Sequence, residues 1–352
     1  MTLPQTVELA PGYSISRIIK GGWQLSGDHG PVDADGAILD MAAYYEAGIT
    51  TFDCADIYTG VEEKIGEFRK YYLRKHGEQG LRNLKVHTKY VPDLSTLGTV
   101  DRAGVAQTIE RSIRRLGVER LDLVQFHWWD YGVPRYVEVA GWLCELQKEG
   151  KIDRISGTNF DTIRTRELVE SGVPLTSMQV QYSLLDQRPA RQFAAFARSN
   201  NISFLCYGAV AGGFLSDRWL GVDDPGESFA NRSLVKYKLI IDDFGGWALY
   251  QRLLSVLKAV GDRHGVSIST VAMRWVLDQP QVAAVLVGVR RGDHLPEHQK
   301  VLGLALLPED HAALNEVLRE ARPVAGDVYA VERDLEGRHG RIMKYELNGV
   351  AA

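Results

Sequence analysis

Short β-prone runs alternate with longer stretches of helical spacing along most of the chain. The runs occupy residues 18–22, 49–55, 84–90, 121–127, 152–158, 177–182, 202–208 and 282–289. This alternation favours parallel strands joined by crossover helices, and eight is the number at which such a sheet closes on itself. We therefore predict an α/β fold, a (β/α)8 or TIM barrel of about residues 16–320, in a single domain that spans 1–352.

The helices between these runs are expected from apolar spacing and from glycines past their ends. In residues 101–116 the apolar side chains Val105, Ile109, Ile113 and Leu116 recur at helical spacing. The other expected helices cover residues 34–47, 62–76, 135–149, 161–171 and 190–199.

Two segments break this rhythm. Residues 214–246 form a long irregular stretch after the seventh run, so this loop is expected on the face where barrel active sites form. Residues 322–352 form a tail rich in glycine and charge. The sequence leaves two interpretations of the tail open: it wraps back over the barrel mouth, or it has no fixed place.

The composition restricts the partners. A net charge of -4 offers no concentrated basic surface for nucleic acid or an anionic membrane. No apolar run approaches the ~20 residues of a membrane helix, and the first twenty residues lack a secretory signal pattern. The three cysteines, Cys54, Cys144 and Cys206, fit reduced thiols. We expect a cytoplasmic protein.

Four proton-active side chains follow consecutive runs. Asp53 ends the second run, Tyr58 lies just after it, Lys89 ends the third and His127 ends the fourth. Singly, each has an ordinary structural explanation as a turn, rim or core residue. In a barrel, however, the carboxyl ends of the strands share one mouth, so the four residues are expected together.

Together these side chains suit proton transfer to an oxygen. A phenol near pKa 10 is a poor acid at pH 7, but an adjacent ammonium stabilises its phenolate. A buried carboxylate keeps that ammonium charged, and a histidine can orient a carbonyl or share its proton. The set therefore predicts an enzyme that protonates an oxygen while a hydride reaches the neighbouring carbon.

The sequence resembles the aldo-keto reductase family from about Ile18 to His298, some four-fifths of the chain. Residues 52–58, FDCADIY, are similar to the family's FDTAxxY segment, and Thr88-Lys89 to its TK. The resemblance implies that Tyr58 is the general acid, that Lys89 lowers its pKa, that Asp53 pairs with Lys89 and that His127 orients the carbonyl.

The resemblance also implies a nicotinamide cofactor, NADPH rather than NADH. Residues 157–160, GTNF, look like the family's GxSNF segment, which places Thr158 and Asn159 on the carboxamide, with Gln179 as the third contact. Tyr207 matches the tyrosine that stacks on the nicotinamide ring. The remaining cofactor positions implied around the cleft are Gly22, Trp23, Asp53, Gly208 and Val210.

The adenosine end departs from the family pattern. Gly288 stands where some members carry a lysine, and His294, Glu297 and His298 stand where Arg or Gln, Glu and Asn are common. Arg290 and Arg291 remain able to bind a 2′-phosphate, beside the N–H groups at the start of the next helix.

The substrate side is expected to be aromatic. Trp23, Tyr58, Trp128 and Trp129, with His127, are predicted to line a pocket for a small-molecule aldehyde, ketone or sugar. The loop 214–246 and the tail are expected to shape the rest of this pocket.

Three other interpretations match parts of the sequence. Residues 294–298 fit the HxxEH zinc pattern, but Pro296 indicates that a helix only begins there, so we expect no metal site. The same residues could run the reaction backwards, as an NAD(P)-dependent aldose or alcohol dehydrogenase. The family also includes potassium-channel β-subunits, which are binding partners, although an intact Asp53, Tyr58, Lys89 and His127 set argues for catalysis.

Overall fold

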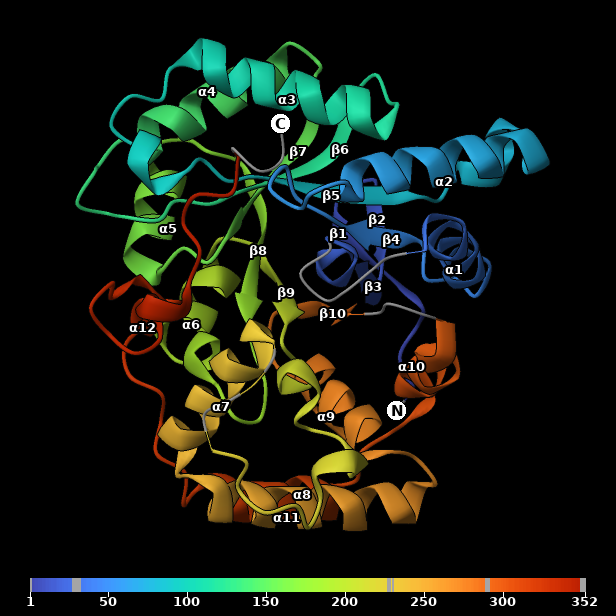
Figure 1. The fold of residues 1–352 in the computed structure, drawn as a ribbon, viewed down its shortest axis with the longest axis vertical. Helices are drawn as coiled ribbons and strands as arrows, with labels where there is room; N and C mark the ends of the chain where they lie inside the picture. The colour runs from blue at the N-terminus through green and yellow to red at the C-terminus, as the bar shows by residue number, and fades with distance from the viewer. Residues whose placement is uncertain (1, 27–32, 227–228, 230, 289–291, 349–352) are drawn as a thin grey trace.

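Eight parallel strands close into a barrel in the computed structural model, which describes residues 2–26, 33–226, 229, 231–288 and 292–348 (Figure 1). Around the barrel the strands are β3 (Ile18–Gly21), β4 (Thr51–Asp53), β5 (Lys85–Tyr90), β6 (Leu121–Phe126), β7 (Ile152–Thr158), β8 (Leu175–Gln181), β9 (Ser203–Tyr207) and β10 (Val282–Gly288). Because β10 pairs with β3, the sheet has no free edge. The predicted (β/α)8 barrel is confirmed.

Helices surround the barrel (Figure 1). They are α1 (Ala34–Glu46), α2 (Val61–His76), α3 (Arg102–Leu116), α4 (Tyr136–Lys148), α5 (Thr162–Glu170), α6 (Gln192–Ser199), α7 (Arg232–Phe244), α8 (Trp247–His264), α9 (Ile268–Leu277), α10 (Leu295–Gly303), α11 (Pro308–Leu318) and the short α12 (Ala330–Arg333). The predicted helices and strands are all present, with ends shifted by no more than two residues.

Helix α3 shows how local sequence sets these boundaries. The Asp101 carboxylate accepts a hydrogen bond from the backbone N–H of Gly104, which caps the first turn. Gly117 ends the helix at φ +65°, a conformation that glycine adopts without a Cβ clash. Between these caps, Val105, Ile109 and Leu116 are buried against the barrel.

An N-terminal hairpin covers the amino end of the barrel and was not anticipated. Strands β1 (Thr6–Ala10) and β2 (Tyr13–Ser16) pair antiparallel. Leu9, Tyr13 and Ile15 form one apolar cluster with barrel residues such as Leu123 and Leu205. With this end filled, the carboxyl ends of the strands are left for a site.

Residues 214–246 differ from the expected irregular loop, because α7 occupies the second half. The buried side chains Tyr237, Ile240, Ile241 and Phe244 recur at helical spacing on one face of α7. This apolar stripe is what makes the segment a packed helix rather than a loop. Before α7, the described residues from Phe214 onward contain one short 3-10 turn, Asp217–Trp219, and no other helix or strand.

Residues 322–348 of the C-terminal tail fold back over the carboxyl end of the barrel, which decides between the two interpretations left open above for this part of the tail. In Figure 1 it runs in red from α11 past α12 and back across the barrel. Asp327 accepts hydrogen bonds from the backbone of Thr162 in α5 and from Gln192 in α6. Further along, Asn348 donates to the carbonyl of Val91, directly after β5.

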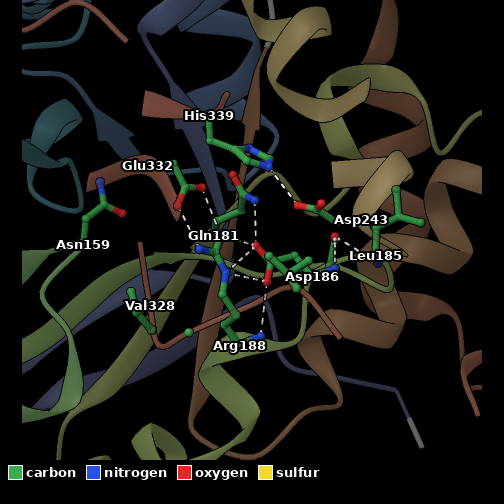
Figure 2. A network of polar contacts seen from close by, with 12 residues as sticks. Asn159, Gln181, Leu185, Asp186, Arg188, Asp243, Val328, Glu332 and His339 are labelled. Atoms are coloured by element: carbon green, nitrogen blue, oxygen red, sulfur yellow. Dashed lines mark hydrogen bonds and ion pairs between the residues drawn. The ribbon is translucent and has the colours of Figure 1, made fainter. Parts of the chain in front are cut away.

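A buried ion network anchors this tail (Figure 2). Arg188, 1% exposed, pairs with Asp186 at 2.6 Å and with Glu332 of α12 at 2.8 Å, and both carboxylates are fully buried. Gln181 donates to Asp186 at 2.7 Å. Burial alone would raise the pKa of Glu332, but the facing guanidinium lowers that pKa to about 2. The tail and the barrel are thus joined by a buried ion pair. Separating them would leave a buried charge without a partner.

We predict that Arg188→Met lowers the free energy of unfolding by about 3–5 kcal/mol, because it leaves two buried carboxylates without their cation. Urea denaturation followed by circular dichroism measures this change. The matched control is Arg252→Met, which removes an ion pair with Glu320 whose side chains are 56% and 50% exposed. This control should leave the unfolding free energy nearly unchanged. Equal, small effects of the two substitutions would contradict the anchoring role of Arg188.

Candidate active site

Strand register brings the predicted proton-transfer residues together. Asp53 is the last residue of β4, Lys89 lies near the end of β5, and His127 follows β6 directly. Lys89 pairs in register with Gln125 on β6, so the three strand ends lie side by side. Asp53, Lys89 and His127 are 3%, 5% and 3% exposed, which places them inside the barrel mouth.

A buried ion pair forms the centre of this mouth. The Lys89 ammonium donates to Asp53 Oδ1 at 2.5 Å and to the carbonyl of Cys54 at 2.8 Å. Asp53 Oδ2 accepts from Gln125 Nε2 and from Gln179 Nε2, both at 2.7 Å. Burial alone would lower the pKa of Lys89, but Asp53 outweighs it and the pKa is raised. Lys89 is therefore held as an ammonium.

Gln125 was missed in the sequence. It is fully buried and faces the same interior as His127, two residues further along the strand. The signal was present, because a polar residue in an otherwise apolar strand, in step with His127, has to meet a partner inside the barrel.

Tyr58 lies against this pair. The Lys89 Nζ is 5.0 Å from the centroid of the Tyr58 ring, and Trp23 contacts the same ring edge-on at 5.0 Å. Burial raises the pKa of Tyr58 above its ordinary value; the charge of Lys89 and its hydrogen bond to the phenol act in the opposite direction and offset part of that rise. Tyr58 is thus a protonated phenol beside a fixed cation.

His127 has one engaged and one unpartnered ring nitrogen. Its Nδ1 is 3.0 Å from the carbonyl oxygen of Thr158, and a carbonyl only accepts, so Nδ1 carries the hydrogen. Burial lowers the pKa of His127 to about 3, and Arg333 and Lys89 add to this. In this neutral imidazole Nε2 carries a lone pair, and it finds no partner among the described residues.

Aromatic side chains surround His127, with one correction to the predicted pocket. Trp129 packs edge-on against the His127 ring at 4.3 Å between centroids. Tyr329, which belongs to the tail, does the same at 5.7 Å. Trp128, by contrast, is fully buried against Phe126, and its indole N–H donates to the carbonyls of Asp130 and Val133. The alternation of the strand continues past His127 and turns Trp128 away from the mouth.

The residues expected at the nicotinamide meet around one cradle at the ends of β7, β8 and β9. Tyr207 donates through its hydroxyl to Asn159 Oδ1 at 2.9 Å, and the N–H of Asn159 donates to the carbonyl of Gln179 at 2.9 Å. Because Gln179 gives its Nε2 to Asp53, its oxygen remains an acceptor, while Asn159 keeps its amide nitrogen as a donor. A carboxamide needs one donor and one acceptor, so these residues fit that group.

Two glycines among the expected cofactor positions have no room for a side chain. A Cβ on Gly22 would lie 2.6 Å from Val61 and 2.8 Å from the Asp53 carbonyl. Gly208 has φ +72° and lies so close to Tyr237 that a Cβ would come within 2.5 Å of its hydroxyl. Val210 follows, at the start of a short 3-10 turn. Only glycine lets the backbone approach this closely.

Some of the residues expected to bind the adenosine part of the cofactor make hydrogen bonds within the protein. Arg290 and Arg291 lie outside the described residues. Glu297 accepts from Ser267 and Lys300, at 3.0 and 2.6 Å, which fixes the start of α10. His294 ends the short turn before that helix. Gly288 faces Gln24, whose amide would collide with any added Cβ.

Lys20 joins this end and was not anticipated. It is 3% exposed, with its ammonium 4.8 Å from the centroid of the Tyr44 ring. The Tyr44 hydroxyl is 3.0 Å from Nδ1 of His298, which is 7% exposed. Burial lowers the pKa of Lys20 to about 8.

The described residues bring together no group of three or more His, Cys, Asp or Glu side chains able to hold a metal ion. Among the same residues, no helix has the length and apolar character required to cross a membrane.

We predict that the His127 imidazole stays neutral, with its proton on Nδ1, from pH 5 to pH 9, because its pKa is lowered to about 3. Nitrogen NMR of protein labelled with ¹⁵N-histidine measures both ring nitrogens, and the signals lost in His127→Gln assign them. Titration within this range, or a proton on Nε2, would contradict the prediction.

Comparison with known proteins places this geometry in one family. Residues 17–319 match the model of the Aldo/keto reductase family. The aldo-keto reductase YhdN of Bacillus subtilis is 28% identical over 311 residues, which cover 87% of this chain and 91% of the relative. An NADH-specific methylglyoxal reductase of Escherichia coli is 24% identical over 320 residues, 86% of this chain and 95% of the relative.

The fold agrees with this match. The solved structure of a glycerol dehydrogenase from Gluconobacter oxydans superposes with a TM-score of 0.75 at 25% identity, covering 92% of this chain and 98% of the other. The family match spans the barrel strands, the Asp53–Lys89 pair and the cradle around Asn159 alike. The protein belongs to the aldo-keto reductase family and is a nicotinamide-dependent oxidoreductase.

Proposed function

We propose that the protein reduces an aldehyde or ketone to an alcohol, with Tyr58 as the general acid. The observation that carries this proposal is the placement of the Tyr58 phenol against the Lys89 ammonium, which Asp53 holds at 2.5 Å. His127 presents its unpartnered Nε2 to the same mouth. A carbonyl oxygen placed there meets Tyr58 as the acid, and once that oxygen is a hydroxyl it can donate to the His127 acceptor.

The cofactor, when bound, supplies the hydride. The chain's own part at that end is to hold and orient the carboxamide with Thr158, Asn159 and Gln179, whose donors and acceptors complement it. In this proposal the Tyr207 ring stacks on the nicotinamide. Holding the ring in one orientation turns the transfer into a positioned step within one complex.

The proton comes from Tyr58 in this proposal. Since burial raises the pKa of the phenol, Tyr58 is protonated at neutral pH and able to donate. As the phenolate forms, the adjacent Lys89 cation stabilises it without having to move. Asp53 keeps Lys89 charged and aimed, with Gln125 and Gln179 filling the remaining lone pairs of its carboxylate.

The neutral His127 favours a second candidate, the reverse reaction. A bare Nε2 accepts a hydrogen bond and cannot donate one to a carbonyl. It suits the hydroxyl of an alcohol, which is the product of reduction and the substrate of oxidation. The same site therefore also supports an NAD(P)-dependent alcohol or aldose dehydrogenase, and one matched relative is named a glycerol dehydrogenase.

The substrate in this proposal is a small carbonyl compound or sugar, bound between Trp23, Tyr58 and Trp129 beneath the tail. The cysteines are unpaired, and Cys54 and Cys206 are buried. This supports a reducing compartment such as the cytoplasm.

We predict that Tyr58→Phe lowers kcat by about 10²–10⁴-fold, the usual contribution of a general acid. Cofactor affinity should stay nearly unchanged, because the phenol oxygen is all that is removed. Steady-state oxidation of NADPH and reduction of NADP⁺, over a panel of aldehydes, ketones, sugars and polyols, measures both directions.

The control for this experiment is Tyr45→Phe, which removes a phenol oxygen bound to the carbonyl of Gly80, away from the mouth. Its turnover should match wild type. Wild-type rates in Tyr58→Phe would refute the proposed acid.

We also predict tighter binding of NADPH than of NADH, through Arg290 and Arg291. A 2′-phosphate bound by two guanidinium groups should gain roughly 10-fold or more in affinity. Fluorescence titration of wild type and of the Arg290→Ala/Arg291→Ala variant measures both cofactors. Equal affinities in the wild type, or a preference that survives the double substitution, would exclude this assignment.

A further inference from the structure

Arg333, the last residue of α12, lies over the ends of two barrel strands. Its guanidinium donates to the carbonyl of Trp128, to that of Trp129 at 2.6 Å and to that of Asn159 at 2.7 Å. It also lies 4.0 Å from the centroid of the Tyr131 ring. One tail side chain thus joins the segment after β6 to the segment after β7.

Asn159 is a residue that needs such support. Its backbone has φ +63°, a left-handed conformation that few residues other than glycine adopt. Its backbone N–H donates to the Gln179 carbonyl, and its side-chain oxygen accepts from the Tyr207 hydroxyl. Its backbone carbonyl is the remaining polar group of the main chain, and this carbonyl accepts a hydrogen bond from Arg333. The guanidinium therefore completes the set of bonds that holds Asn159 in the orientation expected for the carboxamide.

The same guanidinium acts on His127. It holds the carbonyls of the two residues that follow His127 in the chain. After burial, its positive charge is the largest cause of the lowered pKa of His127. Tyr329, one turn earlier in the tail, packs edge-on against the imidazole.

Arg333 is not the only residue that holds the tail in place. Glu332 pairs with Arg188 in the buried network of Figure 2, and Asp243 binds Arg338 and His339 further along. The contacts of Arg333 go instead to the mouth. The tail also lies beyond residues 17–319, so the family match does not account for them.

We propose that Arg333 is a positioning residue that sets Asn159 and His127 for the reaction, which makes the C-terminal tail a working part of the active site. This inference rests on the proposed function. Three donors spread over a planar guanidinium reach three separate carbonyls, and a lysine ammonium cannot reproduce that geometry. Charge and geometry can therefore be separated by substitution.

The test compares Arg333→Lys, Arg333→Met and a control, Arg341→Met, which removes a tail cation whose ion pair with Glu336 has side chains 66% and 90% exposed. Cofactor affinity is measured by fluorescence titration with NADPH and NADH, turnover by steady-state kinetics and thermal stability by calorimetry. Both Arg333 variants should weaken cofactor binding and lower kcat by roughly 10- to 100-fold, since a small misplacement of a positioned group costs this much. The control should change neither quantity.

A second readout separates positioning from a purely structural role. In Arg333→Met the acid titration of His127, followed by its ¹⁵N signals, should move to higher pH, because a cation has been removed. In Arg333→Lys, which keeps the charge, it should move less. Both variants should keep the far-ultraviolet circular dichroism of the wild type.

The inference is overturned if Arg333→Met binds cofactor and turns over like the wild type. It is also overturned if turnover falls only in parallel with thermal stability while cofactor affinity and the His127 titration stay unchanged. Failure of the proposed function gives a different result: the wild type turns over no carbonyl or alcohol. The cofactor titration then still decides the role of Arg333.

Discussion

The buried pair of Lys89 and Asp53 is the interaction on which the site depends. Removing two charges from water costs several kcal/mol for each ion, and the cost is recovered only when geometry and further hydrogen bonds are good. Here the Asp53 carboxylate accepts hydrogen bonds from Lys89, Gln125 and Gln179, which lie on three different strands. Those partners exist only because the sheet is closed and in register. The acid–base centre therefore depends on the closed barrel.

The second constraint is the tail. Arg188 and Glu332 make the tail part of the buried structure, and Arg333 then brings a cation to the carbonyls beside His127 and Asn159. A surface segment held by exposed contacts would be free to leave the mouth. A segment held by an ion pair that is 1% and 0% exposed cannot leave without stranding a charge.

These two constraints explain the state of the individual groups. Lys89 is held charged by Asp53, and Tyr58 is held neutral by burial. His127 is neutral because burial and the positive charges of Arg333 and Lys89 lower its pKa, and its bond to the Thr158 carbonyl fixes the position of its proton. The protonation states of the side chains in the barrel mouth thus follow from which charges are buried beside them. The Thr158 carbonyl decides which nitrogen of His127 carries the lone pair.

The sequence by itself determined the barrel and the strand ends on which Asp53, Lys89 and His127 stand, because hydrophobic periodicity and strand ends are local properties. It also predicted α1 to α6, whereas α7 was expected as part of an irregular loop and α8, α9, α11 and α12 were not predicted. Tertiary structure alone decided the partner of Gln125, the proton position on His127 and the place of the tail. Each of these depends on which distant backbone or side chain comes within hydrogen-bond reach, as when Arg333 meets Asn159, 174 residues away in the chain.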